Sequence, residues 1–364
     1  MKIAVLGDTH LGVRSDNIAF HSFFARFYRE TFFPYLEAHP EIKYVVQTGD
    51  LFDRRKFVNY NTLYLSKGYF FNWFTYPNRP TLITYPGNHD IFYKNTLEVN
   101  SHEMLLKDYI RGGHILSYSE PATMEFDGTK IDFIPWICKG NEAMVRKFIE
   151  NTDSQIAFGH FEIAGFEMER GNICNEGMQR NDLDKYEIVI SGHFHHKSTD
   201  GHIYYVGAPC EHTWSDYDDP RGFHIFDTQT RELEFIENPF RIHHKIIYDD
   251  TIDTLESIQS KDFGKYTSNL IKVVVQNKSN PFMFDIFMDR LYQSNPLDVS
   301  IVENFSDTNI SDEDVAEHMD STITLITKAV DGVETNLDKD RLKNFMREIY
   351  QEAEMIESAK GILQ

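Results

Sequence analysis

The chain has 364 residues, of which 41% are hydrophobic and 14% aromatic. At roughly 150 residues per domain this length predicts two or three folded units, and the composition excludes a globally disordered protein. The formal net charge of −21 argues against binding nucleic acid or anionic membrane through the overall field. Three cysteines without a Cys-x-x-Cys pair exclude a disulfide scaffold and a cysteine-ligated zinc finger. No stretch approaches the roughly 18 apolar residues of a membrane span and no signal-peptide pattern precedes Ile3, so we expect a cytoplasmic protein.

In the first 240 residues, short runs rich in β-branched and aromatic residues alternate with segments of helical period. This alternation is typical of α/β folds with a largely parallel or mixed sheet. Helices are predicted at 19–36, 61–74 and 98–110, the first with phenylalanines at nearly helical spacing. The predicted strands span 2–6, 44–47, 81–85, 130–135, 155–158, 187–190, 203–206 and 223–226.

The pattern changes near residue 240. A strand at 269–276, a helix at 281–292 and a strand at 298–303 predict a small α/β unit, which a polar, acidic linker follows. Two amphipathic helices are then expected, from about 311 and 337. An amphipathic stripe records burial but not its target, so these helices either pack on this chain or bind a partner. Their apolar positions are Val315, Met319, Ile323, Ile326, Leu342, Phe345 and Ile349.

The residues that indicate function stand at the ends of five predicted strands, each after a glycine. Ligands of open α/β sheets bind just beyond the carboxyl ends of strands, so these side chains should meet at one edge. Residues i and i+2 of an extended strand share a side, and we expect this of both Asp-x-His and His-x-His. Carboxylates, imidazoles and an amide suit Mn²⁺, Fe²⁺ or Zn²⁺, and so many ligands predict a pair of ions ~3.5–4 Å apart. The residues are Asp8, His10, Asp50, Asn88, His89, Asp90, His160, His193 and His195.

This motif series resembles that of the calcineurin-like metallophosphoesterases. The resemblance implies an α/β sandwich with mixed sheets and two divalent ions per chain. It makes Asp8, His10 and His195 ligands of one ion and Asn88, His160 and His193 ligands of the other, with Asp50 bridging both. It also makes His89 the general acid that protonates the leaving oxygen, with Asp90 orienting His89 through the other ring nitrogen.

Three segments narrow the resemblance to the SbcD-type nuclease subunits of double-strand-break repair. They are Gly-Asp-Thr-His-Leu-Gly at 7–12, Gly-Asp-Leu-Phe-Asp at 49–53 and Ile-Asp-Phe-Ile-Pro-Trp at 131–136. Together with the segment 218–223 they look closest to the recombination nuclease subunit of T-even-type bacteriophages. Some relatives carry a histidine where this chain has Asp53, so we expect Asp53 to support a metal ligand from behind.

The narrower resemblance implies a Mn²⁺-dependent DNA nuclease with 3′→5′ exonuclease and single-strand endonuclease activity. The nuclease domain would span 1–240 and a capping domain that positions DNA would span 241–305. The helix pair of 306–364 would bind an SbcC-type coiled-coil ABC ATPase, and helices at 61–74 and 98–110 would form a homodimer.

Other interpretations remain open. Two local basic clusters, which either bind DNA or are solvated surface, comprise Arg54, Arg55 and Lys56, and Arg241 with Lys245. The alternative functions are a small-molecule, cyclic-nucleotide-type phosphodiesterase and a scaffold subunit whose metal site is dispensable.

Overall fold

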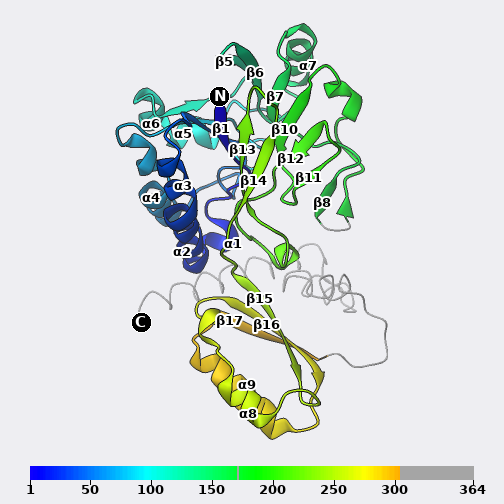
Figure 1. The fold of residues 1–364 in the computed structure, drawn as a ribbon. Helices are drawn as coiled ribbons and strands as arrows, with labels where there is room; N and C mark the ends of the chain where they lie inside the picture. Colours follow the sequence, from blue (N-terminus) through cyan, green and yellow to red (C-terminus); the bar gives the residue numbers. More distant parts are fainter. Residues whose placement is uncertain (170–171, 304–364) are drawn as a thin grey trace, which may run out of the picture. The chain divides into compact units, whose positions relative to one another are not determined.

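The structure is a computed structural model that describes residues 1–169 and 172–303 (Figure 1). The chain divides into a compact unit, Met1–Glu303, and a second unit, Asn304–Gln364. The predicted helix pair, with its apolar positions from Val315 to Ile349, lies outside the described residues. Within the described ranges, no helix has both the length and the apolar character that crossing a membrane requires.

Two six-stranded sheets form the core of the first 240 residues. In the first sheet β1 to β4 are parallel and β13 and β14 are antiparallel additions, in the order β14 (Leu233–Glu237), β13 (Gly222–Asp227), β1 (Lys2–Leu6), β2 (Tyr44–Gln47), β3 (Thr81–Thr84), β4 (Ile115–Ser117). The second sheet has parallel strands at its centre, in the order β11 (Ser198–Thr199), β12 (Ile203–Tyr205), β10 (Ile188–Gly192), β7 (Ile156–His160), β6 (Thr129–Ile134), β5 (Ala122–Phe126).

The two sheets pack face to face through fully buried side chains such as Val5, Val46 and Phe158. Aromatic residues of the 18–38 segment pack on the outer face of the first sheet, and Val145 and Ile149 of α7 (Glu142–Asn151) pack on the second. Figure 1 shows the blue helices against the first sheet and the green α7 against the second. This four-layer arrangement confirms the predicted α/β sandwich with mixed sheets. The covering elements of the first sheet are α2 (Ile18–Phe27), a π-helical turn (Tyr28–Phe32), α3 (Phe33–Ala38) and α4 (Tyr60–Tyr69).

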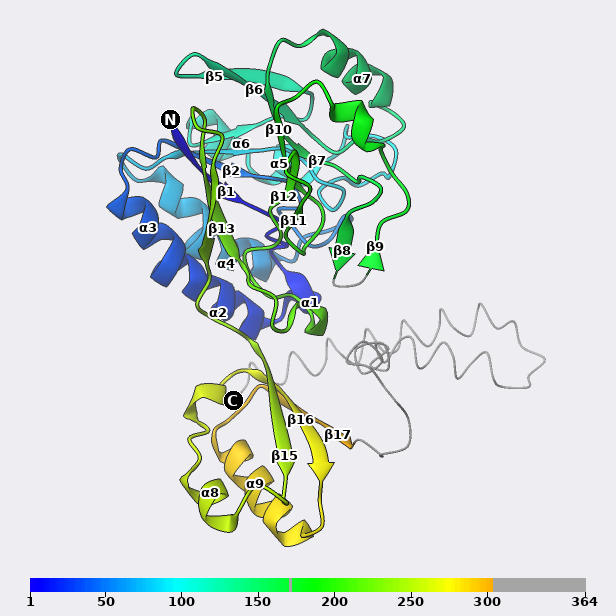
Figure 2. The same ribbon diagram turned by 45° about the vertical axis from the view of Figure 1, so that its right-hand side comes forward.

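A third sheet follows, with three parallel strands and its own core. It contains β15 (His243–Asp249), β16 (Leu270–Asn277) and β17 (Asp298–Glu303), and α8 (Leu255–Ser260) and α9 (Pro281–Gln293) lie on the same face of it (Figure 2). The predicted strand, helix and strand are confirmed, whereas β15 and α8 are additional. The division of this part from the nuclease domain at residue 241 stays a prediction.

The remaining elements are short. The helix predicted at 98–110 is two helices, which meet at Leu106. The short elements are α1 (Val13–Asp16), a 3₁₀ helix (Phe71–Thr75), α5 (Ser101–Leu105), α6 (Lys107–Arg111), β8 (Glu167–Glu169), β9 (Asn172–Ile173) and further 3₁₀ turns at Arg180–Leu183, Trp214–Asp216 and Gly264–Tyr266.

Candidate metal centre

The loops after β1 and β2 are tied together by backbone hydrogen bonds. The N–H of His10 donates to the Asp50 carbonyl at 3.0 Å, and the N–H of Leu11 donates to the Leu51 carbonyl at 2.9 Å. These bonds hold the Asp-x-His loop and the Gly-Asp loop in register. The two sequence motifs therefore reach one site because their main chains pair.

The expectation that both i, i+2 pairs lie on extended strands is wrong. β1 ends at Leu6 and β10 ends at Gly192, before the histidines that follow. His10 has φ +41°, Asp50 has φ +52° and His193 has φ +90°, all in the left-handed region. Such conformations cost about 1–3 kcal/mol each for side chains with a Cβ, and they cluster at functional sites. At these three positions the left-handed backbone conformation directs the side chain of a predicted ligand toward the same site.

One group of predicted ligands surrounds His10. Its Nε2 lies 2.9 Å from His195 Nε2 and 3.6 Å from Asp50 Oδ2. Its Nδ1 lies 3.4 Å from Asp53 Oδ1. A carboxylate behind the far ring nitrogen fixes the orientation of a ligating imidazole. Asp53 therefore makes the contact that a supporting residue needs, and its role stays a prediction.

A second group surrounds His160. Its Nδ1 donates a hydrogen bond to the Thr48 carbonyl at 2.8 Å, so Nε2 faces the site. This Nε2 lies 3.4 Å from Asp50 Oδ2 and 3.0 Å from Asn88 Oδ1. The same amide oxygen lies 2.9 Å from His193 Nδ1. Asp50 thus contacts both groups, as a bridging carboxylate must.

Asp8 is fully buried and closes the arrangement. Both of its oxygens accept hydrogen bonds from the backbone N–H of His193, at 3.0 and 3.1 Å. Its Oδ1 lies 3.5 Å from His160 Nδ1. Gly192 leaves room for Asp8 and Gly87 leaves room for Asp50, because a Cβ at either position would overlap the neighbouring carboxylate. All seven predicted ligands therefore lie in one place.

The donor set fits divalent ions with open coordination positions. Two carboxylates, four imidazoles and one amide converge, and their charges favour an added cation. The amide oxygen of Asn88 faces His193 Nδ1, His160 Nε2 and Asp50 Oδ2. If hydrogen bonds alone decided the orientation, the amide nitrogen would face these three atoms and donate to them. In this orientation the amide oxygen would be available to a cation bound among these atoms.

The pKa values show the same preference for positive charge. Burial lowers the pKa of His10, but the contact with Asp53 and the charges of Asp50 and Asp8 outweigh it and raise the pKa to about 9. Burial also opposes the charge on His160, whose pKa is nevertheless raised to about 9 by Asp50 and Asp8. The pKa of Asp8 itself is raised to about 7, chiefly by burial. The buried carboxylates raise the pKa values of the neighbouring imidazoles because they stabilise positive charge. A bound metal ion would supply that positive charge in place of the protons.

Comparison with known proteins identifies the fold family. The family model described as "Calcineurin-like phosphoesterase" matches residues 1–197. The chain belongs to this family. Exonuclease subunit 1 of Enterobacteria phage T4 is 30% identical to this phosphoesterase over 354 residues, which cover 97% of this chain and 99% of the relative. Members of the family use divalent metals, which agrees with the donor set.

Two solved structures are also similar to parts of this phosphoesterase. An archaeal phosphodiesterase is 16% identical with a TM-score of 0.34, covering 65% of this chain and 99% of its own. A hypothetical protein from Thermus thermophilus is 12% identical with a TM-score of 0.35, covering 66% of this chain and 100% of its own.

The metal-free phosphoesterase is expected to lose stability as the pH rises from 7 to 9. The pKa values of His10 and His160 are about 9 in the folded chain against 6.5 in the unfolded chain. The stability that each contributes is complete below pH 6.5 and is lost as the pH rises through 9. The pKa of Asp8 is about 7 in the folded chain against 3.8 in the unfolded chain. Its effect also lowers stability as the pH rises, but this loss is complete by pH 7. Two such shifts amount to a few kcal/mol, or roughly 5–10 °C in Tm.

Thermal unfolding at pH 7 and pH 9, with EDTA or with Mn²⁺, measures this loss. Bound ions keep both imidazoles neutral at either pH, so the loaded phosphoesterase should show a much smaller change. An equal change with and without metal would contradict the assignment of both histidines as ligands.

The structure corrects the expected partner of His89. Its Nδ1 lies 2.6 Å from the backbone carbonyl of Asp53, so Nδ1 carries the proton of the neutral ring. Asp90 points elsewhere, because its carboxylate accepts hydrogen bonds from the backbone N–H groups of Leu51 (3.0 Å), Phe52 (3.1 Å) and Gly87 (3.0 Å). Asp90 therefore ties the second motif loop to the third, and the Asp53 main chain orients His89.

Replacing Asp90 with alanine is expected to lower the free energy of unfolding by about 3 kcal/mol or more, because three backbone donors lose their acceptor. Ser101→Ala, which removes one 3.0 Å hydrogen bond to the same carboxylate, is the matched control and should cost about 1 kcal/mol. Urea denaturation of both variants measures the difference. A fully stable Asp90→Ala variant with an altered pH–rate profile would instead favour the role first predicted for Asp90.

Sequence reasoning missed three residues that contact the site. Glu162 Oε1 lies 3.6 Å from His193 Nε2, and Arg221 donates a hydrogen bond to the His195 carbonyl. His212 lies beside His195, at 5.1 Å between ring centroids. Burial, together with the charges around it, holds the pKa of His212 well below its usual range. Glu162 follows His160 by two residues, a spacing that offers a signal, whereas a lone His212 offers none.

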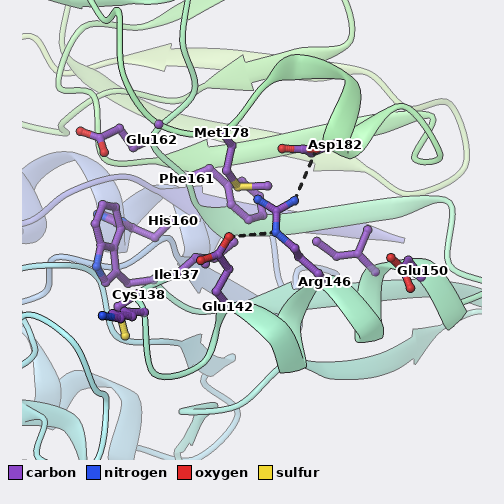
Figure 3. A pocket seen from close by; sticks show the side chains of 14 residues that line it. Ile137, Cys138, Glu142, Arg146, Glu150, His160, Phe161, Glu162, Met178 and Asp182 are labelled. Atoms are coloured by element: carbon purple, nitrogen blue, oxygen red, sulfur yellow. Dashed lines mark hydrogen bonds and ion pairs between the residues drawn. The ribbon is translucent and has the colours of Figure 1, made fainter.

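A cavity of about 370 Å³ opens beside His160 and Glu162 (Figure 3). Figure 3 shows the lining residue Arg146 between Glu142 and Asp182. Its guanidinium lies 3.0 Å from Glu142 Oε1 and 3.5 Å from Asp182 Oδ1. The apolar part of the lining includes Trp136, Ile137, Phe161 and Met178. The cavity is therefore next to the second group of ligands.

Proposed function

We propose that the chain is the nuclease subunit of a DNA recombination and repair complex, acting on DNA phosphodiesters with two Mn²⁺ ions. The observation that carries the proposal is the convergence of seven ligand side chains in a chain that is 30% identical to phage T4 exonuclease subunit 1 over nearly its full length. That relative is an exonuclease by name. Digestion would run 3′→5′ on duplex ends, with endonuclease activity on single strands, in the cytoplasm of a phage-infected cell.

In this proposal, Asp8, His10 and His195 hold one ion, Asn88, His160 and His193 hold the other, and Asp50 contacts both. The ions would supply an activated water and neutralise charge on the phosphate. His89 would protonate the leaving oxygen from Nε2, because its Nδ1–H is held by the Asp53 carbonyl.

The surroundings of some of the predicted basic residues support a role for them in binding DNA. Arg55 Nη2 lies 3.3 Å from the Asn88 amide, and Lys56 is exposed nearby. Arg54 is held by Ser15 Oγ at 2.8 Å. The guanidinium of Arg241 is occupied by Glu237 at 2.6 Å and by backbone carbonyls, so Arg241 is not part of the proposed DNA surface. A DNA contact of Lys245, half-buried on β15, stays a prediction.

The proposed partners are a second copy of the chain and an SbcC-type ABC ATPase. Tyr60 and Tyr64 on α4 are 90% and 76% exposed, and Met104 on α5 is 54% exposed, which supports α4 and α5 as the homodimer surface. The ATPase would bind the helix pair of 306–364, and the unit of 241–305 would position DNA. The word "subunit" in the name of the T4 relative agrees with a complex.

Digestion of end-labelled linear duplex by the purified full chain, across Mn²⁺, Mg²⁺, Zn²⁺ and no metal, tests this function. Mn²⁺-dependent shortening from the 3′ end supports it. Arg55→Ala should weaken DNA binding, whereas Arg231→Ala, which removes an arginine paired with Glu187 at 3.1 Å, should not. Tight ATPase binding without any turnover, lost on deleting 311–364, would favour the scaffold function.

The cavity beside His160 is the feature that bears on one alternative, a phosphodiesterase for nucleotide-sized esters. Its lining includes the carboxylates of Glu142, Glu150, Glu162 and Asp182 against the cations of Lys139 and Arg146. This excess of acidic groups disfavours binding of a small anionic ester inside this cavity, so the cavity does not support that alternative. Turnover of cyclic nucleotides without cleavage of duplex DNA would reverse that choice.

A further inference from the structure

His212 is outside the ligand set of the proposed two-ion site, yet it lies beside it. Its ring centroid is 5.2 Å from that of His10 and 5.1 Å from that of His195. One ring nitrogen from each of the three histidines lies within 4.8 Å of the others. A third imidazole is therefore within reach of an ion that His10 and His195 hold.

His212 is also buried without a polar partner. It is 1% exposed, and neither ring nitrogen has a hydrogen-bond partner among the described residues. A buried polar atom left unpaired costs about 1–3 kcal/mol, and native proteins retain few of them. Phe24 packs against the ring at 5.6 Å between centroids. This contact packs the ring against an apolar neighbour but gives neither ring nitrogen a hydrogen-bond partner.

The loop that carries His212 is held firmly in place. The backbone N–H of His212 donates to Asp216 Oδ2 at 2.6 Å. Its neighbour Glu211 is fully buried and accepts hydrogen bonds from the backbone N–H groups of Ile242 and His243, both at 2.9 Å. These buried hydrogen bonds fix the backbone that carries His212, and the packing against Phe24 places its ring beside the ligands.

We infer that His212 is an additional nitrogen ligand of the ion assigned to Asp8, His10 and His195. The inference rests on the two-ion site of the proposed function. It gives this ion three imidazoles and two carboxylates, counting the shared Asp50. The other ion has two imidazoles, one amide and the same shared carboxylate.

The two ions then differ in chemistry. A six-coordinate first ion would keep one position for a water or substrate oxygen, and the second would keep two. Nitrogen-rich donor sets favour Fe²⁺, Co²⁺ or Zn²⁺, whereas oxygen-rich sets suit Mn²⁺. The first site is therefore expected to bind a given metal more tightly than the second and to accept the later metals more readily.

Titration of the metal-free full chain with Co²⁺, in competition with a chromophoric chelator, tests the inference. His212→Phe keeps the ring packed on Phe24 and removes both nitrogens. It should weaken the tighter site by about 100-fold or more and leave the weaker site almost unchanged, a larger loss than the 10–100-fold typical of residues that only support a ligand. His224→Phe is the matched control, because His224 is a buried histidine on β13 with an unpartnered Nδ1, packed on Phe235. It should change neither affinity.

A second measurement needs no variant. In the Co²⁺-loaded wild-type chain, each ligating imidazole contributes one strongly shifted N–H signal to the proton NMR spectrum. Five such signals support the inference, and four overturn it. Unchanged affinities in a folded His212→Phe variant would also overturn it while leaving the two-ion site intact. A wild-type chain that binds fewer than two ions would remove the two-ion site as well, so the two failures are distinguishable.

Discussion

Replacing Asp50 with asparagine is expected to lower phosphodiester hydrolysis by at least about 1,000-fold and bound metal from two ions to one or none per chain. Asp50 Oδ2 lies 3.6 Å from His10 Nε2 and 3.4 Å from His160 Nε2, so a single carboxylate contacts both ligand groups. Its Oδ1 accepts the backbone N–H of His89 at 2.7 Å. Asparagine keeps the shape but removes the charge that both proposed ions share.

Metal content by mass spectrometry, together with turnover of linear duplex, measures this effect. Asp53→Asn is the matched control, because it makes the same chemical change at a carboxylate that contacts only the His10 group, at 3.4 Å. The control should weaken one ion by roughly 10–100-fold and leave the other in place. If the Asp50→Asn variant retained two ions and most of its activity, Asp50 would not be the shared ligand.

The fold could be predicted from sequence because its strands carry local signals. β1 and β2 were predicted with their observed bounds, since each is a short apolar run that ends at a polar cluster. Short or exposed elements were missed, among them β4, β5 and α7. α7 has Val145, Phe148 and Ile149 at helical spacing against the core, so its pattern offered a signal that the prediction did not use.

The sequence was sufficient to predict which residues form the site, but not which neighbouring groups orient them. Glycine-flanked Asp, His and Asn at five strand ends indicate a shared metal site, and those side chains do converge. Sequence does not show whether a side chain or a carbonyl holds a neighbouring ring. At His89 the orienting group is therefore the main-chain carbonyl of Asp53, and the predicted Asp90 carboxylate binds backbone N–H groups instead. His212 was missed because a long-range contact, not a local pattern, brings it to His10.

Replacing His89 with alanine is expected to lower kcat on DNA by about 10²–10⁴-fold while both ions remain bound. The ring holds no proposed ion, and the contribution of His89 to the ligand set is its backbone N–H, which donates to Asp50 at 2.7 Å and which alanine keeps. The ring Nδ1–H is fixed by the Asp53 carbonyl at 2.6 Å, so Nε2 is the atom that can give a proton to a leaving oxygen.

The dependence on the leaving group separates this role from a structural one. Bis(4-nitrophenyl) phosphate releases a nitrophenolate that needs no proton, so the His89→Ala variant should lose far less activity on this ester than on DNA. Added imidazole should restore part of the activity on DNA. His39→Ala, which removes a surface histidine paired with Glu41 at 3.1 Å, should change neither substrate. Equal losses on both esters together with loss of metal would show that the His89 ring stabilises the metal site, and the proton donor would then have to be a different group facing the same ions.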